Sequence, residues 1–513
     1  MIPIEKPAIA ESRWLAGRFM PGPEDLVFAV VLGVTLAGGR YGLFGDPGTP
    51  WHFRLGNDIL ASGSVARCDH LTWTRAGTPW VDQSWGFDVL LAGIVNSWGW
   101  SMTVALTAIG LAVLYASMAR GLVRDGAAPI SAIAAALLAA GIGAIHFLIR
   151  PHLFTYGFVY LSLRACQRQH ERGGTSVFLV PLYTAILANL HGGFVALPVI
   201  VATAALGHAI SGGWDRARLR QVLTFALAAG LSALAALANP YGIGLYRHVV
   251  GLLFSSGLTT MINEYQPAPF GRPGAEILEW FLLALVALPV VSSRRIDRYP
   301  LVHVLVWLHL ALTSIRNAPF FAMAAAPAIA SLIDGLPLSS RRSWKPDGRA
   351  SVWPAVAAAA LLVVAARGVW LGGFDPHKWP FDALATLDRQ PLSSRLFHEQ
   401  DWGGLIEART SPLRRTYLDD RFELFGKKAI VEYVEVLTGG PTWDEVGTRD
   451  RIDLVWLRPD RGLAKRLKKD PSWTVLFEDR VSVLLALRPP GVTTRASLRT
   501  GRSSGPTWLS AHR

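Results

Sequence analysis

The sequence is poor in charge, and this scarcity excludes an ordinary soluble protein. Only 17% of its 513 residues are charged, whereas 51% are hydrophobic and the mean hydropathy is +0.32. Soluble domains carry about 25% charged residues. The deficit comes from long apolar runs, which predict a polytopic α-helical membrane protein.

Cysteine is also scarce. The two cysteines, Cys68 and Cys166, fall in loops on opposite sides of the membrane in the topology predicted below. This arrangement excludes a disulfide between them, and two cysteines are too few for a Cys-based metal site. The chain also lacks a P-loop and a glycine-rich dinucleotide-binding motif that opens a helix after a strand.

The apolar runs predict eleven membrane spans, each about 17–22 residues long. Several follow one another with almost no loop, and Pro151 and Pro319 mark two of these tight turns. The predicted spans are 26–44, 100–119, 128–149, 152–166, 176–193, 194–211, 222–239, 276–292, 300–317, 319–336 and 351–371.

The net charge of +13 follows from topology and does not require a nucleic-acid partner. Of the 27 basic residues before position 371, 18 lie in the N-terminus and in alternate loops with their flanks. The positive-inside rule therefore predicts a cytoplasmic N-terminus. An odd number of spans then places the first loop and the C-terminal domain outside. The basic loops are 120–127, 167–175, 212–221, 293–299 and 337–350.

The transmembrane region, 1–371, contains a long first outer loop at 45–99. The stretch Asp46–Trp85 is polar and rich in tryptophan, which is unusual for a simple connection. Two interpretations of the apolar segment Gly86–Gly99 remain open. It is either an interfacial helix or the first turns of a long, tilted second span.

The composition changes after Leu371, and the segment 372–488 alternates strand-like with helix-like runs. This order predicts a small α/β domain with a mostly parallel sheet, in which the last two strands form an antiparallel hairpin. The tail 489–513 is rich in Arg, Ser, Thr and Pro and is predicted to be disordered. The expected strands are 395–398, 416–419, 453–457, 474–478 and 481–487, and the expected helices are 382–390, 428–437 and 461–469.

Polar residues of unusual kind gather on the predicted outer face. Ionisable residues at membrane depth are costly and tend to mark function. They come from the first loop and from several separate helix ends: Asp46, His52, Arg54, Asp58, Asp69, Asp82, Arg150, His152, His191, Asn239, Tyr241, Glu264 and Arg316.

Several of these residues belong to motifs. The first loop contains Asp46, the run Trp51-His52-x-Arg54-x-Gly56, Asp69 and the pair Trp80 and Trp85. Together with the later motifs it resembles the bacterial GT-C-type membrane glycosyltransferases, and within them a poorly characterised group that ends in an outer domain. The later motifs are Arg150-Pro151-His152, Asn189-Leu190-His191-Gly192-Gly193, Asn239-Pro240-Tyr241-Gly242, Glu264-Tyr265-Gln266-Pro267, Arg316-Asn317-Ala318-Pro319-Phe320, Trp402-Gly403-Gly404-Leu405 and Leu418-Asp419-Asp420-Arg421-Phe422-Glu423-Leu424.

The resemblance implies an inverting transferase that moves a sugar from a polyprenyl-phosphate carrier to an acceptor at the outer face. In the wider superfamily an acidic residue of the first outer loop is the base or lies beside a metal, and the matching position is Asp46. The superfamily often has two acidic residues there, whereas this chain has the single carboxylate of Asp46-Pro47-Gly48. We take Asp46 and Asp69 as the catalytic candidates.

The chemistry of the residues is compatible with this activity. A carboxylate takes the proton of the acceptor hydroxyl. Arginine binds phosphate through its fork, so Arg54, Arg150 and Arg316 are the candidates for the donor phosphate. The remaining site candidates are His52, His152, His191 and Glu264. A divalent metal is an open expectation, because no tight ligand spacing supports one.

Each candidate also has a structural interpretation. Asp46 lies in an ordinary turn sequence, Asp69 is suited to capping, and His191 precedes two glycines at a helix end. The sequence Asp419-Asp420-Arg421 is interpreted as an internal ion pair. Two other functions stay open: a transporter or flippase of a lipid-linked or anionic substrate, and a non-catalytic scaffold of envelope assembly. The sugar and the acceptor are not identified by the sequence.

Overall fold

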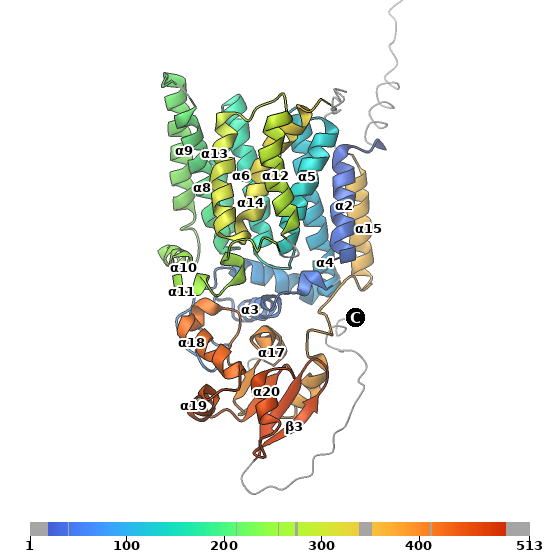
Figure 1. Ribbon diagram of the computed structural model, residues 1–513, viewed down its shortest axis with the longest axis vertical. Helices are drawn as coiled ribbons and strands as arrows, with labels where there is room; N and C mark the ends of the chain where they lie inside the picture. The colour runs from blue at the N-terminus through green and yellow to red at the C-terminus, as the bar shows by residue number, and fades with distance from the viewer. Residues whose placement is uncertain are drawn as a thin grey trace, which may run out of the picture.

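The computed structural model describes residues 19–488, apart from 39–40, 212, 255, 272–274, 338–350 and 411–412. The protein is mostly helical, with a small sheet near its C-terminus. Upright helices stand side by side in a bundle, and residues 372–488, here called the C-terminal unit, lie beyond one end of it (Figure 1). The predicted disordered tail, 489–513, and most of the basic loop 337–350 lie outside the described residues.

A helix overlaps each of the eleven ranges predicted as spans. Among the described residues, four stretches are long and apolar enough to cross a membrane: Trp85–Arg124, Pro129–His146, Gly192–Ile210 and Ile315–Asp334. The upright helices are α2 (Pro23–Gly38), the second part of α4 (Trp85–Arg124), α5 (Pro129–Gly143), α6 (His152–Arg172), α7 (Val180–Leu187), α8 (Ala196–Ile210), α9 (Arg216–Ala235), α12 (Glu276–Val291), α13 (Arg298–Thr313), α14 (Ala318–Asp334) and α15 (Trp353–Ala366).

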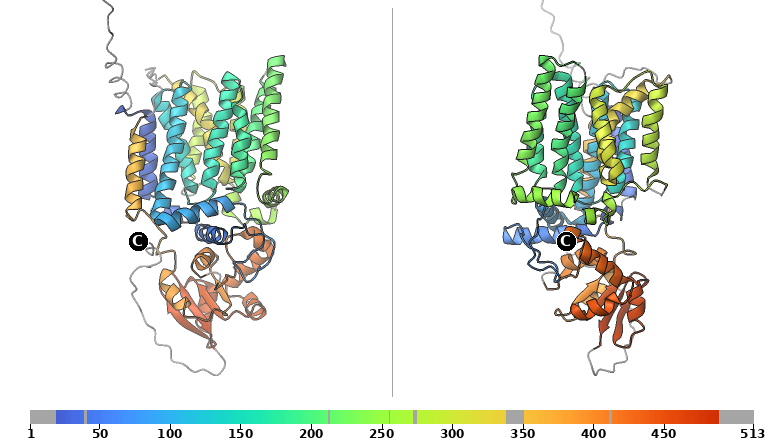
Figure 2. Two further views of the ribbon diagram at one scale, coloured as in Figure 1. Left: turned by 180° about the vertical axis from the view of Figure 1, so that it is seen from behind. Right: turned by 60° about the vertical axis from the view of Figure 1, so that its left-hand side comes forward.

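Helix α4 changes direction at Gly99, where φ is 78° and ψ is 177°. Glycine tolerates this left-handed φ because it lacks a Cβ. The part of α4 before Gly99 runs across the end of the bundle, and the part after it stands upright (Figure 2). Of the two interpretations of Gly86–Gly99, the structure therefore supports a separate transverse helix.

Further short helices lie at this same end of the bundle. Helix α3 (Gly48–Ser62) was not predicted, and it packs on the transverse part of α4. A Cβ on Gly56 of α3 would lie 2.0 Å from the Asp88 carbonyl oxygen, so the two helices approach each other too closely for a side chain. Helices α10 (Ile243–Leu253) and α11 (Ser256–Thr259) also lie here (Figure 1).

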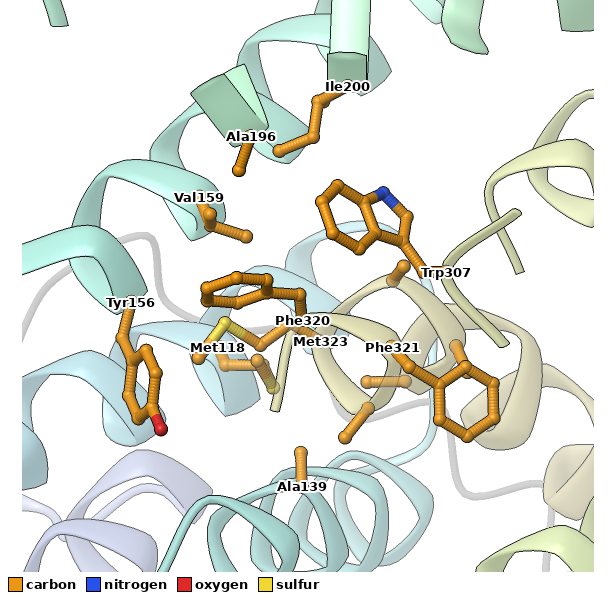
Figure 3. Packing of buried hydrophobic residues seen from close by; sticks show 14 of the residues in the cluster. Met118, Ala139, Tyr156, Val159, Ala196, Ile200, Trp307, Phe320, Phe321 and Met323 are labelled. Atoms are coloured by element: carbon orange, nitrogen blue, oxygen red, sulfur yellow. The ribbon is translucent and has the colours of Figure 1, made fainter. Parts of the chain in front are cut away.

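The bundle core combines small residues with large aromatic ones. Most of the fully buried residues on α5 are alanines, including Ala135 and Ala139, and α5 packs against the alanine-rich α14. Small residues allow helix backbones to approach closely, as is common in membrane-protein bundles. Figure 3 shows the aromatic part of this core, where Trp307 and Phe320 lie edge to face with ring centroids 5.4 Å apart.

The C-terminal unit contains a four-stranded sheet in the order β1-β2-β4-β3. Only β1 and β2 are parallel, whereas β2–β4 and β4–β3 are antiparallel, so the predicted mostly parallel sheet is wrong. The predicted hairpin of the last two strands is confirmed. The strands are β1 (Leu396–His398), β2 (Leu454–Leu457), β3 (Trp473–Glu478) and β4 (Val483–Leu487). The helices are α16 (Leu384–Leu387), α17 (Gly403–Thr410), α18 (Phe422–Leu437), α19 (Thr442–Arg449) and α20 (Gly462–Leu467).

The predicted strand at 416–419 is not part of this sheet. Thr416 instead pairs with Thr72 of the first loop in an isolated parallel bridge. The Trp73 amide donates to the Thr416 carbonyl at 2.9 Å, and the Thr416 amide donates to the Leu71 carbonyl at 3.1 Å. The extended segment was recognised from its sequence, but its partner is a distant loop. The first loop and the C-terminal unit are therefore hydrogen-bonded to each other.

Two further contacts fix this docking. Arg421 is buried between Asp69 of the first loop, at 2.8 Å, and Asp419 of its own segment, at 2.5 Å. Helix α17 packs directly on α3, and a Cβ on Gly404 would lie 2.5 Å from the Pro47 carbonyl oxygen. The glycine of the Trp402-Gly403-Gly404-Leu405 motif thus permits this close approach.

Candidate functional site

A polar cavity of about 430 Å³ lies between the end of the bundle and the C-terminal unit; we call it the chamber. Its walls come from the first loop, from the turn before α6, from residues 261–265, from Arg316 and from residues 400–401 and 420–423. Segments far apart in the chain therefore meet here. Seven of the nine predicted site residues line it: Asp46, His52, Arg150, His152, His191, Glu264 and Arg316.

The centre of the chamber is an arginine between two carboxylates. The Arg150 guanidinium donates to Asp46 at 2.9 Å and lies 3.5 Å from Asp420 of the C-terminal unit. Asp420 also accepts a hydrogen bond of 2.5 Å from the Trp51 indole. A Cβ on Gly48 would come within about 3 Å of all three charged groups. Glycine at this position therefore leaves room for the cluster.

The two carboxylates differ in how they are held. Asp46 accepts from the Gly48 amide at 2.7 Å through one oxygen and from Arg150 through the other. Burial raises its pKa above the usual value, and Arg150 opposes this shift. Burial also raises the pKa of Asp420, to about 7, against the opposing effect of Arg150. Asp420 is therefore a carboxyl group that titrates near neutral pH.

Glu264 and Arg316 face the same space from the other side. Glu264 lies 3.9 Å from Arg150. Burial acts to raise its pKa, but Arg150 and Arg316 outweigh burial and lower the pKa to about 2. The Arg316 guanidinium stacks over the Tyr265 ring at 4.4 Å. Within the part of the chain that the structure describes, no carboxylate lies within 4.0 Å of it.

A second, mostly apolar cavity of about 560 Å³ leads away from the chamber between helices α6, α8, α10, α13 and α14; we call it the groove. It shares wall residues with the chamber, among them His191, Glu264 and Arg316. The two cavities therefore adjoin, with Arg316 in the wall of both. The apolar wall of the groove includes Val195, Ala196, Val199, Leu252, Leu253, Phe254, Trp307, Leu310 and Phe320.

The three histidines are held by local contacts. His52 pairs with Asp88 of α4 at 2.6 Å, and its Nε2 is buried without a hydrogen-bond partner among the described residues. The His152 ring bonds to the His146 carbonyl at 2.6 Å. The His191 Nδ1 accepts from the Gly193 amide in the first turn of η4 (Gly192–Val195), so His191 has the geometry of a helix cap. His191 also lines the chamber.

Two predicted site residues lie apart from the chamber walls. Asp69 is buried against Arg421 and caps the turn to Thr72, with an amide contact of 3.1 Å and a hydroxyl contact of 2.6 Å. Arg54 pairs with Asp58 one turn along α3, at 2.7 Å. The structure therefore gives Asp69 a docking role and groups Arg54 with Asp58 rather than with Arg150 and Arg316.

Sequence reasoning missed Asp420. The internal ion pair predicted for Asp419-Asp420-Arg421 is present, but it joins Asp419 to Arg421 and leaves Asp420 in the chamber wall. The signal was the second of two consecutive carboxylates, because neighbouring residues in an extended segment have side chains on opposite sides. The Asn239-Pro240-Tyr241-Gly242 motif holds the first loop. The Tyr241 hydroxyl donates to the Ala66 carbonyl and accepts from the Asp82 amide.

No group of three or more His, Cys, Asp or Glu side chains suited to a metal ion occurs among the described residues. The divalent metal accordingly stays a prediction. The chain matches no protein-family model, and no curated protein matches it. The geometry of the chamber and groove, and the resemblance of the motifs to those of GT-C-type membrane glycosyltransferases, are therefore the basis for proposing a function.

Proposed function

We propose that the protein is a GT-C-like membrane glycosyltransferase that moves a sugar from a polyprenyl-phosphate donor to an acceptor at the outer face of a bacterial inner membrane. One observation carries this proposal. A polar chamber adjoins an apolar groove between helices, and Arg316 lines both. This is the shape and polarity of a molecule with a charged head and a long hydrocarbon tail.

In this proposal the polyprenyl chain occupies the groove between α8, α13 and α14. Burial of each CH₂ group there is worth about 0.8 kcal/mol. Arg316 binds the phosphate, and its planar fork matches phosphate oxygens. The sugar and the acceptor hydroxyl meet in the chamber, where one of the carboxylates beside Arg150, Asp46 or Asp420, takes the proton.

The same proposal includes eleven spans with the N-terminus in the cytoplasm and the C-terminal unit in the periplasm. The distribution of basic residues supports it. Loops 120–127 and 293–299 join upright helices at the end of the bundle opposite the C-terminal unit (Figure 1). Cytoplasmic loops are enriched in Lys and Arg, so the chamber then opens on the periplasmic side.

The experiment is the mass-spectrometric profile of envelope glycans and glycolipids in a deletion strain, complemented at matched protein abundance. Val199→Trp fills the groove wall on α8, and Leu206→Trp is its control on the same helix, because Leu206 is 49% exposed and lies outside the groove. We expect the deletion to lose one sugar-bearing species. Wild type and Leu206→Trp restore it, and Val199→Trp does not.

Three outcomes would contradict the proposal. An unchanged profile in the deletion strain means that no glycosyl transfer depends on the protein, as for a scaffold. A lost species that accumulates as its lipid-linked precursor on the cytoplasmic side means that the protein moves the lipid across the membrane, as a flippase does. Restoration by Val199→Trp means that the groove does not hold the donor.

A further inference from the structure

We infer that the proton acceptor of the transfer is Asp420 of the C-terminal unit, and that Asp46 of the first loop positions Arg150. This inference rests on the proposed function. It assigns the C-terminal unit a direct part in the chemistry, whereas the resemblance of the motifs points to the first loop alone.

Both oxygens of Asp46 are already engaged. One accepts from the Gly48 amide at 2.7 Å, and the other accepts from Arg150 at 2.9 Å. Hydrogen bonds to the charged form of a carboxylate stabilise that form, and here they oppose the rise in pKa that burial causes. Asp46 is thus well placed to hold Arg150, and each of its oxygens already has a donor.

Asp420 retains accepting capacity. Its Oδ1 accepts from the Trp51 indole, whereas its Oδ2 lies 3.5 Å from Arg150, longer than a normal hydrogen bond. The side chain is only 8% exposed, yet it lines the chamber. A hydroxyl in the chamber can therefore donate to Oδ2. The raised pKa of Asp420 agrees with this role, because a general base works best when its pKa is near the working pH.

Three charged residues act on the pKa of Asp420, and they come from three separate segments. Arg150 lies before α6, Asp46 lies before α3, and Asp419 precedes Asp420 in the chain. Arg150 lowers the pKa of Asp420, whereas Asp46 and Asp419 raise it. The other titratable or charged residues of the chamber wall are His52, Asp82, His152, His191, Glu264, Arg316, Asp401, Arg421 and Glu423.

The chemical step is balanced without any redox partner. The acceptor oxygen forms a bond to the anomeric carbon while its proton moves to Asp420 Oδ2. The bond between the anomeric carbon and the phosphate oxygen breaks, and its electron pair stays on that oxygen. The leaving polyprenyl phosphate gains one negative charge, which Arg316 stabilises at the mouth of the groove.

The test is a pH–rate profile between pH 5.5 and 8.5. Purified protein is mixed with membrane vesicles from the deletion strain, which retain the unused donor and acceptor. The variants are Asp420→Asn, Asp420→Glu and Asp46→Asn. Asp444→Asn is the control, because Asp444 is an exposed carboxylate of the same unit that pairs with Arg466.

We expect the wild-type rate to rise with pH and to level off above about 7, as Asp420 loses its proton. Asp420→Asn lowers the rate about 100-fold or more, the usual contribution of a general base, and removes the pH dependence. Asp420→Glu keeps the pH dependence at a lower rate, which a purely structural role would not produce. Asp46→Asn loses rate but keeps a pH-dependent profile, displaced to lower pH because the Asp46 charge no longer raises the pKa of Asp420. Asp444→Asn matches wild type.

A flat profile for Asp46→Asn, together with a wild-type profile for Asp420→Asn, would overturn the inference and make Asp46 the base. Wild-type behaviour of both variants would also overturn it. In each of these cases the proposed function stands. A wild-type protein that transfers nothing would instead remove the proposed function.

Discussion

Replacing Asp69 by Asn separates a docking role from a catalytic one. Asp69 and Arg421 are both buried, with side chains 0% and 1% exposed, and their charged atoms lie 2.8 Å apart. Removing one partner of a buried ion pair typically destabilises by about 3–5 kcal/mol. We expect about 3 kcal/mol, the lower end of that range, because Asp419 continues to neutralise Arg421.

Because this free energy stabilises the contact between the first loop and the C-terminal unit, its loss makes that contact open more often. A change of about 3 kcal/mol corresponds to about a 100-fold larger open population, at about 1.4 kcal/mol per factor of ten. Limited proteolysis measures that population when opening and closing are fast relative to cleavage. We expect cleavage of Asp69→Asn to be about 100-fold faster than cleavage of wild type, and Asp444→Asn, in an exposed ion pair, to change it less than about fivefold.

The rate of transfer per folded molecule provides the second measurement on Asp69→Asn. We expect it to stay within about tenfold of wild type, since a general base contributes about 100-fold or more. Wild-type resistance to proteolysis combined with complete loss of transfer would refute the reasoning. Asp69 would then act in the chemistry, as the first-loop sequence predicted.

Two other predictions concern packing and pH. Gly404→Ala puts a Cβ 2.5 Å from the Pro47 carbonyl oxygen, so we expect a loss of about 1–3 kcal/mol in stability and faster proteolysis. Gly157→Ala is the control, because its Cβ meets open space and should not speed proteolysis. Because the folded pKa of Asp420 is about 7 and its ordinary value is 3.8, the folded state binds more protons between these values. Stability therefore falls as pH rises from about 4 to about 7, and the melting temperature of Asp420→Asn should fall less over that window; equal slopes would contradict the assignment.

The order of the helices was largely predictable from hydropathy alone. Runs of apolar residues identify helices without knowledge of the segments that pack against them. For this reason each predicted span overlaps a helix. Amphipathic helix α3 was not predicted, because its mixture of polar and aromatic residues is also typical of a loop. The predicted strand pairing in the C-terminal unit was wrong, because the relative direction of neighbouring strands depends on connections that the sequences of short strands do not encode.

The candidate site was only partly predictable. Arg150, Glu264 and Arg316 were recognised because isolated charges at helix ends stand out against apolar sequence. The partnership of Asp46 with Asp420 joins residues 374 positions apart, and no local pattern reports it. For the same reason the pairing of Asp69 with Arg421 was not visible from the sequence.

The most direct test of the central claim is the binding of a polyprenyl phosphate to the purified protein, measured by native mass spectrometry. The account predicts one bound lipid on wild type and on Leu206→Trp, none on Val199→Trp, and weakened binding on Arg316→Gln. The matching polyprenol, which lacks phosphate, should bind more weakly and should not respond to Arg316→Gln. Equal binding of the polyprenyl phosphate to all four proteins would contradict the claim that the groove and the chamber hold one lipid-linked donor.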